Sequence, residues 1–276
     1  MLKSKSTLTR ILRSVCAIAL MTAALAQAAE LRIGGTGNAL GTMRLLSEAF
    51  AKAQPAAKSI VLSSIGSSGA IKAVPKGAID IGLSSRPLTE EETRTGMTTI
   101  EYARAPTVFA VQEKNPVTAL TVEQIADIYT GKLASWPDGT PIRLVMRQPG
   151  DDNTRQIKQL SAAIEQALAV AEKRPGLNFA SNDQEAADKM ESIQGSLGVT
   201  ALSLIRSEQR SLRALALNGI TPTTDNLQAG RYPAAMVKRF YFVLPKEPGP
   251  ATQEFLKFVR SAEARKLLEQ TGHIIP

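Results

Sequence analysis

Three loops of this sequence combine glycine and small polar residues with the start of a predicted helix, an arrangement suited to holding an anion. They span residues 34–41 (GGTGNALG), 66–69 (GSSG) and 147–154 (RQPGDDNT), and each follows a predicted strand. Glycine lets a backbone amide approach a ligand closely, and the helix N-terminus favours negative charge. Arg147 adds a guanidinium group that suits an oxyanion. The loops therefore indicate a small-oxyanion site at the carboxyl ends of strands.

Each of these features also has an ordinary structural use. Gly-Ser loops are often plain turns, and aspartate beside a helix start, such as Asp151 or Asp152, is commonly an N-cap. Arg147 has the alternative of pairing with a surface carboxylate. The repetition of strand, loop and helix three times in one chain is what favours an anion site over unrelated turns.

The candidate residues argue against catalysis and against cofactor binding. Residues 34–41 lack the Lys-Ser/Thr pair of a phosphate-loop NTPase and the glycine spacing of a dinucleotide site. The one histidine, His273, lies close to the C-terminus, and the one cysteine, Cys16, lies in an N-terminal apolar run. A zinc site or a Ser-His hydrolase would need unusual ligands or bases. We therefore expect no enzyme, no metal site and no cofactor.

Residues 1–29 have the pattern of a secretory signal peptide. Four cations at positions 3, 5, 10 and 13 precede an apolar run over 15–25, which ends at the small-residue site Ala26-Gln27-Ala28. The run is too short to span a bilayer, and the alternative to a signal peptide is a buried N-terminal helix. We expect export to the periplasm and a mature chain that starts at Ala29 or Glu30.

The composition predicts a globular mature protein without disulfides. Hydrophobic residues make up 43% of the chain, and Cys16 would be removed with the signal peptide. The residues before Cys16 do not match the pattern of a lipid-modified cysteine. Of the formal charge of +8, the signal segment contributes four cations and no carboxylate, so a mild positive excess remains. Runs of Lys and Arg with interleaved aromatics are lacking, so we expect no nucleic-acid partner.

Strands and helices alternate along the chain, which predicts an α/β sheet with parallel pairing. Two short apolar segments, 107–111 and 239–244, are candidate crossings between two lobes. They predict a discontinuous lobe 1 formed by residues 30–108 and 240–276, and a lobe 2 formed by residues 109–239. Single helices are expected over 153–172 and over 250–270.

Several motifs resemble the phosphate-binding proteins of ABC transporters, within the type II periplasmic binding proteins. The resemblance covers most of the chain after the signal segment and rests on residues 65–69 (IGSSG), 80–89 (DIGLSSRPLT), 120–132 with Trp136, 255–261 and 271–276. It implies a two-lobed α/β type II periplasmic-binding-protein fold, with two crossover segments and a ligand cleft. It also implies a monomer that captures an oxyanion, most of all phosphate, for ABC-type uptake through the membrane subunits of a transporter. The alternative is a non-transport binding or sensory protein of the same fold with another ligand.

The resemblance also implies a set of ligand-binding residues. That family holds its anion with the first loop, the first serine of the Gly-Ser-Ser-Gly turn, an aspartate after the third strand and an Arg-x-x-Gly-Ser-Gly-Thr loop. Transferred to this sequence, and extended to neighbouring polar residues, the candidate set is Asn38, Ala39, Leu40, Ser67, Ser68, Ser85, Arg86, Arg147, Asn153 and Thr154.

Three positions depart from the family pattern. Ser85 stands in place of the aspartate, Ala39 in place of a hydroxyl residue, and Asp151-Asp152-Asn153 in place of Ser-Gly-Thr. In such a site, a carboxylate accepts a hydrogen bond from the proton of hydrogen phosphate and excludes sulfate, which has no proton to donate. Either Asp151 or Asp152 restores that acceptor from the other lobe, or both repel the anion. Arg86 is placed to offset such a repulsion.

Overall fold

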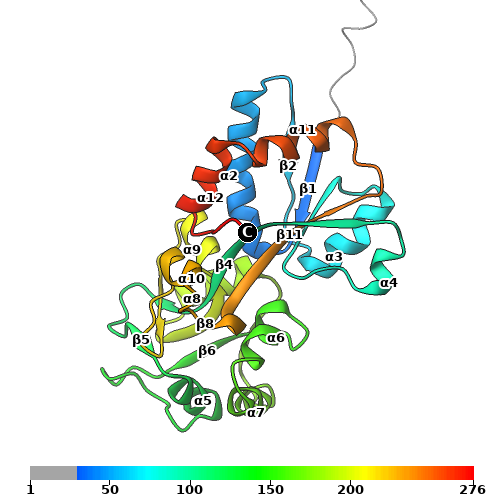
Figure 1. Cartoon of the computed structure of the whole chain (residues 1–276). Coiled ribbons are helices and arrows are strands. Elements are labelled where there is room, and N and C mark those ends of the chain that lie inside the picture. Colours follow the sequence, from blue (N-terminus) through cyan, green and yellow to red (C-terminus); the bar gives the residue numbers. More distant parts are fainter. Residues whose placement is uncertain (1–29) are drawn as a thin grey trace, which may run out of the picture.

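The computed structural model describes residues 30–276 as a mixed sheet flanked by helices (Figure 1). The predicted signal peptide lies outside the described residues. Within residues 30–276, no helix has the length and apolar character needed to cross a bilayer.

The N-terminal part alternates short strands with helices, which follows from its alternating apolar runs and glycine-containing loops. Its elements are β1 (Leu31–Gly35), α2 (Gly37–Ala53), β2 (Ser59–Val61), α3 (Gly66–Ala73), the 3-10 turn η1 (Val74–Lys76), β3 (Ile81–Ser84) and α4 (Glu90–Thr93). β1 pairs in parallel with both β2 and β3. The carboxyl ends of β1 and β3 therefore lie at the same edge of the sheet.

Two long strands run through both halves of the molecule. They are β4 (Thr98–Gln112) and β11 (Val237–Leu244), which pair with each other in antiparallel orientation (Figure 1). β11 also pairs with β3, whereas the later part of β4 pairs with strands of the other half. The two apolar segments predicted as crossings lie within these strands.

The second half repeats the alternation with different lengths. Its elements are β5 (Ala119–Leu120), α5 (Val122–Thr130), β6 (Arg143–Arg147), α6 (Asp152–Lys158), α7 (Ala162–Ala171), β7 (Asn178–Ala180), α8 (Asp183–Ser192), β8 (Ser196–Ala201), α9 (Leu202–Ser207), β9 (Leu212–Ala214), β10 (Ala216–Leu217), α10 (Thr224–Gln228) and the 3-10 turn η2 (Ala234–Met236). The sheet order is β2-β1-β3-β11-β4-β8-β6-β7, with β9 beside β4, and β6 is parallel to β7 and β8.

Two expected helices are each divided in two by a serine. The helix expected over 153–172 is α6 followed by α7, and Ser161 caps α7 by accepting a hydrogen bond from the Ile164 amide. The helix expected over 250–270 is α11 (Pro250–Val259) followed by α12 (Ala262–Gln270), and Ser261 caps α12 in the same way. Serine at such a position stabilises a new helix start more than the interior of one long helix.

Separate buried apolar clusters stabilise the two halves. The N-terminal cluster includes Phe50 of α2 together with Phe255 and Phe258 of α11, with ring centroids 5.3 and 5.5 Å from that of Phe50. A second cluster around Ile125 and Trp136 fills the other half. The chain after β11 thus returns to the N-terminal half, where α11 and α12 lie beside α2 (Figure 1).

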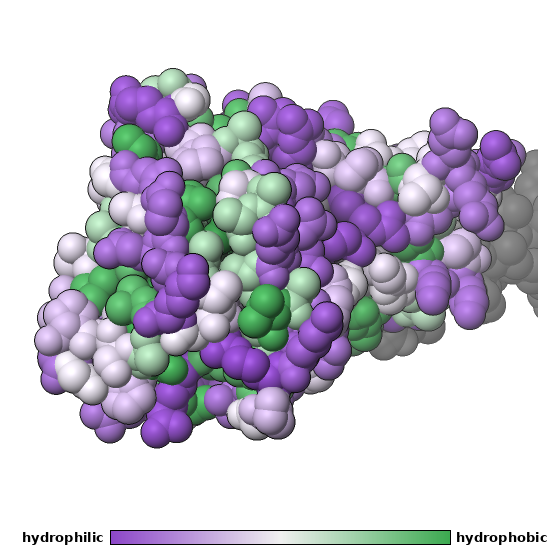
Figure 2. All heavy atoms as spheres, turned by 90° about the horizontal axis from the view of Figure 1, so that it is seen from below, coloured by the Kyte–Doolittle hydropathy of each residue, from purple (hydrophilic) through white to green (hydrophobic). Residues whose placement is uncertain are grey.

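The outer face seen from below is chemically mixed. Figure 2 shows hydrophobic residues in small groups among hydrophilic ones on this face. Such interspersion is typical of a solvated protein surface.

Candidate functional site

The structure brings residues of all three predicted loops into contact between the two halves of the molecule. The Asn38 side chain, at the start of α2, lies 3.5 Å from the side-chain oxygen of Asn153 in α6. The hydroxyl of Ser67, at the start of α3, donates a hydrogen bond of 2.5 Å to Asp152, also in α6. Three helix N-termini therefore meet at one place.

Arg147 lies at the carboxyl end of β6, and its side chain is only 11% exposed. Its guanidinium group donates to Asp183 over 2.5 Å and to Asp151 over 2.7 Å. Asp151 is also the N-cap of α6, because it accepts a hydrogen bond from the Asn153 amide. Asp151 is thus both the N-cap of α6 and an ion-pair partner of Arg147.

Asp183, the first residue of α8, lies at the centre of a polar cluster formed with Asn38, Arg147 and Asn153, and it is 5% exposed. Its carboxylate accepts hydrogen bonds of 3.1 Å from the Asn38 backbone amide and 3.1 Å from the Asn153 side chain, besides the bond from Arg147. Donors from α2, β6 and α6 therefore converge on one carboxylate. That carboxylate lies among donors predicted to bind an oxyanion.

Sequence reasoning missed Asp183, although a signal for it existed. Asn182 and Asp183 follow the short strand β7 and open α8, which makes this a fourth strand-loop-helix junction. Asn182 is the N-cap, since its side chain accepts from the Glu185 amide, and an acidic residue in the first helical turn is common for electrostatic reasons. Nothing in the local sequence distinguishes this ordinary use from a contact with Arg147.

The first loop contributes less than expected beyond Asn38. Ala39 and Leu40 are buried in the apolar cluster of the N-terminal half, and the Ala39 amide donates to the carbonyl of Thr36. Asn38 itself is held by the Ala201 amide, which donates to its side-chain oxygen over 3.0 Å. The start of α2 is therefore fixed against the second half by both its backbone and its side chain.

The second loop and the residues after β3 form a polar wall beside the cluster. Ser67 accepts a hydrogen bond of 3.0 Å from the Ser85 amide, and the Ser85 hydroxyl bonds to that of Thr36 over 3.1 Å. Arg86 makes two bonds of 2.8 Å to Glu92, and this pairing lowers the pKa of Glu92 to about 2. Ser68 is exposed. The guanidinium group of Arg86 is thus already neutralised by its own neighbour.

Thr154 and Lys238 are two further buried polar residues of this region. Thr154 is buried, with its hydroxyl 3.5 Å from the carbonyl of Arg147. Lys238 of β11 is 2% exposed and was not predicted to belong to the site. Burial lowers the pKa of Lys238, whereas the carboxylates of Asp152, Asp183 and Asp151 oppose that shift.

Carboxylates outnumber cations at the centre of this region. Burial and the neighbouring Asp183 raise the pKa of Asp151, and Arg147 and Lys238 counteract them. His273 lies elsewhere, fully buried with its ring centroid 5.2 Å from that of Phe240. The arrangement suits reversible binding of a charged group, and His273, which contacts Thr271 and Phe240, lies outside it and does not serve it as a base.

Comparisons with known proteins agree with this architecture. Residues 22–263 match the model of a family described as the PBP superfamily domain. The phosphate-binding protein PstS of Bacillus subtilis is 24% identical over 260 residues, which cover 90% of this chain and 80% of that protein. The phosphate-binding protein PstS of Borreliella burgdorferi is 23% identical over 222 residues, covering 77% of this chain and 76% of that protein.

A solved structure is similar over nearly the whole described chain. It is a putative phosphate ABC transporter substrate-binding protein from Clostridium perfringens with bound phosphate. It matches with a TM-score of 0.75 at 24% identity, covering 90% of this chain and 99% of that chain. At this identity the match shows a shared fold.

Proposed function

The chain belongs to the PBP superfamily, and from that premise we propose that it captures a small oxyanion, with phosphate as the leading candidate, for ABC-type uptake. It has the two-lobed α/β fold of the type II periplasmic binding proteins, and it is a solute-binding protein, not an enzyme. We propose that the protein captures the solute in the periplasm and delivers it to the membrane subunits of a transporter.

The observation that carries the proposal is the environment of the Asp183 carboxylate. The Asn38 amide, the Arg147 guanidinium group and the Asn153 side chain all donate to it, and they come from both halves of the molecule. Amides at a helix N-terminus and a guanidinium group are the donors that oxyanions prefer. A set that holds a carboxylate of the chain is chemically able to hold the oxyanion of a solute.

We propose that the solute takes over these donors when Asp183 moves aside. Lobe 1 (residues 30–108 and 240–276) and lobe 2 (residues 109–239) would then turn relative to each other about β4 and β11. Asp183 follows a short loop and lies in the first turn of α8, so we expect its release to involve a movement of that helix start. Binding then exchanges one anion for another at the same donors, which limits the net change of buried charge.

The ligand choice depends on the acidic neighbours of the donors. Asp152 accepts a hydrogen bond from Ser67, and this supports a carboxylate acceptor beside the proposed anion site. A carboxylate acceptor favours hydrogen phosphate, which carries a proton, over sulfate, which carries none near neutral pH. This supports phosphate as the leading candidate despite serine at position 85.

The test is an oxyanion panel on protein free of copurified anion. Residues 30–276 are unfolded, dialysed, refolded and titrated by calorimetry with phosphate, sulfate and molybdate, with chloride as the control. We expect phosphate to bind and sulfate to bind at least about tenfold more weakly, a difference of about 1.4 kcal/mol. If none of the oxyanions binds to the refolded protein, the proposed function is wrong.

A further inference from the structure

We infer that Lys238 of β11 is a ligand-binding residue of this cleft and that its ammonium group contacts the oxyanion of the bound solute. This inference rests on the proposed function and adds a residue that lies outside all the motifs of the sequence. Two observations support it: Lys238 lines a cavity between the halves, and the arginines that line the same cavity are paired with carboxylates.

The cavity has a volume of about 360 Å³ and is lined by both halves of the molecule. Ser85 and Arg86, after β3, line it from the first half, and Asp152 and Arg155 of α6 line it from the second. Lys238 lines it from β11, the strand that connects the halves. Lys238 therefore lies at the wall of a cavity that both halves of the molecule line, next to Asp152 of α6.

The arginines of this cavity already have carboxylate partners. Arg86 pairs with Glu92, Arg155 pairs with Asp152, and the weaker pair of Arg239 with Glu101 spans 3.6 Å. Lys238 differs from them, because the carboxylates that influence its pKa, those of Asp152, Asp183 and Asp151, act through their charge and not through a hydrogen bond to it. Among the described residues that line this cavity, Lys238 is thus the cation for which no ion pair with a carboxylate is found.

Burial makes this lack of a partner significant. The Lys238 residue is 2% exposed, and lysine is rarely found so deep in a protein unless it is paired. Asp151, Asp152 and Asp183 act on Lys238 electrostatically and favour its charged form. Their charges oppose the lowering of the Lys238 pKa by burial, and an incoming anion would oppose it further.

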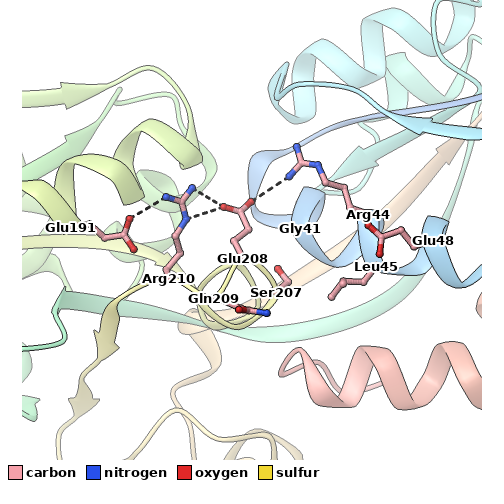
Figure 3. A pocket seen from close by; sticks show the side chains of 9 residues that line it. All are labelled: Gly41, Arg44, Leu45, Glu48, Glu191, Ser207, Glu208, Gln209 and Arg210. Atoms are coloured by element: carbon pink, nitrogen blue, oxygen red, sulfur yellow. Dashed lines mark hydrogen bonds and ion pairs between the residues drawn. The ribbon is translucent and has the colours of Figure 1, made fainter.

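A second surface hollow provides the contrast. It has a volume of about 530 Å³, between α2 and residues 207–210. Figure 3 shows Arg210 between Glu191 and Glu208, and Arg44 of α2 pointing toward Glu208 from the other side. Its cations are therefore paired with carboxylates of the chain. This larger hollow offers no uncommitted cation among its lining residues, whereas the Lys238 cavity does.

The shared chemistry of the expected solute is a tetrahedral oxyanion, above all a phosphoryl group. A cavity of about 360 Å³ lies at the lower end of the range of about 300–1,000 Å³ usual for small-molecule sites. This leaves room either for inorganic phosphate with water or for a small phosphate monoester. The two sources are separated by titrating with each.

The experiment compares the parent protein with Lys238→Met, Lys238→Arg and the control Lys257→Met, whose lysine is exposed on α11. Each refolded protein is titrated with inorganic phosphate and with glycerol 3-phosphate. We expect Lys238→Met to weaken binding of the preferred compound by about 10- to 100-fold, because a charged hydrogen bond is lost. Lys238→Arg should retain more affinity than Lys238→Met, and Lys257→Met should equal the parent.

The outcomes separate this inference from the proposed function. If the parent binds phosphate and folded Lys238→Met binds it equally well, the inference is wrong and the proposed function stands. If the parent binds neither compound, both are wrong. A crystal structure of the phosphate-bound parent decides the matter even when Lys238→Met does not fold. The Lys238 ammonium nitrogen within about 3.2 Å of a phosphate oxygen supports the inference, and a clearly longer distance overturns it.

Discussion

The carboxylate of Asp183 accepts a hydrogen bond of 3.1 Å from the backbone amide of Asn38, so the N-termini of α8 and α2 meet at one negative charge. The two residues come from different halves of the molecule and are 145 positions apart. Both helix dipoles and the Arg147 guanidinium group stabilise that charge. We therefore regard Asp183 as an internal anion that competes with the solute.

Replacing Asp183 by asparagine should strengthen phosphate binding. Asparagine keeps the shape of the side chain but removes the charge, so the donors lose their best internal partner. A hydrogen bond to a charged group is worth about 1.5–3 kcal/mol, and we expect a gain of roughly tenfold or more in calorimetric affinity.

Asp188→Asn is the matched control for this prediction. Asp188 lies on the same helix, its side chain is 64% exposed and it pairs with Arg210 at the surface. It should leave affinity unchanged. Weaker phosphate binding by Asp183→Asn would contradict the interpretation of Asp183 as a competitor and would make it part of the solute site.

Replacing Ser85 by aspartate should raise the preference for phosphate over sulfate. Ser85 lies next to Ser67 and lines the Lys238 cavity, so a carboxylate there adds an acceptor that only a protonated oxyanion satisfies. We expect the ratio of the two dissociation constants to grow by about tenfold. Ser63→Asp, at an exposed position, is the control for the added charge, and an equal ratio in both variants would refute the prediction.

Replacing Phe50 by alanine should destabilise the fold. Phe50 is 1% exposed and packs between Phe255 and Phe258, which join the C-terminal helices to α2. Truncation of a buried phenylalanine lowers the free energy of unfolding by about 3–5 kcal/mol. Urea unfolding measures this change, and Lys52→Ala, at an exposed position of the same helix, should have little effect.

His273 should make the protein less stable in mild acid. Burial lowers the pKa of its ring to about 4 from an ordinary value of 6.5. Between these values the unfolded chain binds a proton that the folded chain does not, so stability falls as the pH decreases. From neutral pH to about pH 5 we expect a loss of about 2 kcal/mol from this group.

The variant His273→Leu isolates this effect. Its free energy of unfolding in urea should change less between the two pH values than that of the parent protein. Equal pH dependence of both proteins would show that other groups cause the acid destabilisation.

The sequence was sufficient to predict the fold class. The family motifs predicted the two-lobed architecture, and the start of α6 was predicted to within one residue. The starts of α2 and α3 lie earlier than expected, because residues 37–41 and 66–69, predicted as loops, already form the first turns of these helices. The breaks at Ser161 and Ser261 were missed, because serine is also tolerated inside a helix and the apolar spacing continues across both breaks.

The charges of the site were less accessible to sequence analysis. Asp183 resembles an ordinary residue of a first helical turn, and its contact with Asn38 depends on how the two halves face each other. Lys238 lies beside the apolar run 239–244 and reads as a boundary residue of a strand. Its burial depends on the tertiary position of β11 beside β4, which no local pattern encodes.

The most direct test of the central claim is the phosphate affinity of Arg147→Ala relative to the parent protein, measured by calorimetry after refolding. Arg143→Ala is the control, because Arg143 is exposed on the same strand. Loss of a charged hydrogen bond predicts binding weaker by about 10- to 200-fold in folded Arg147→Ala, with Arg143→Ala unchanged. Unaltered phosphate affinity in Arg147→Ala would contradict an oxyanion site at the meeting point of α2, α6 and α8.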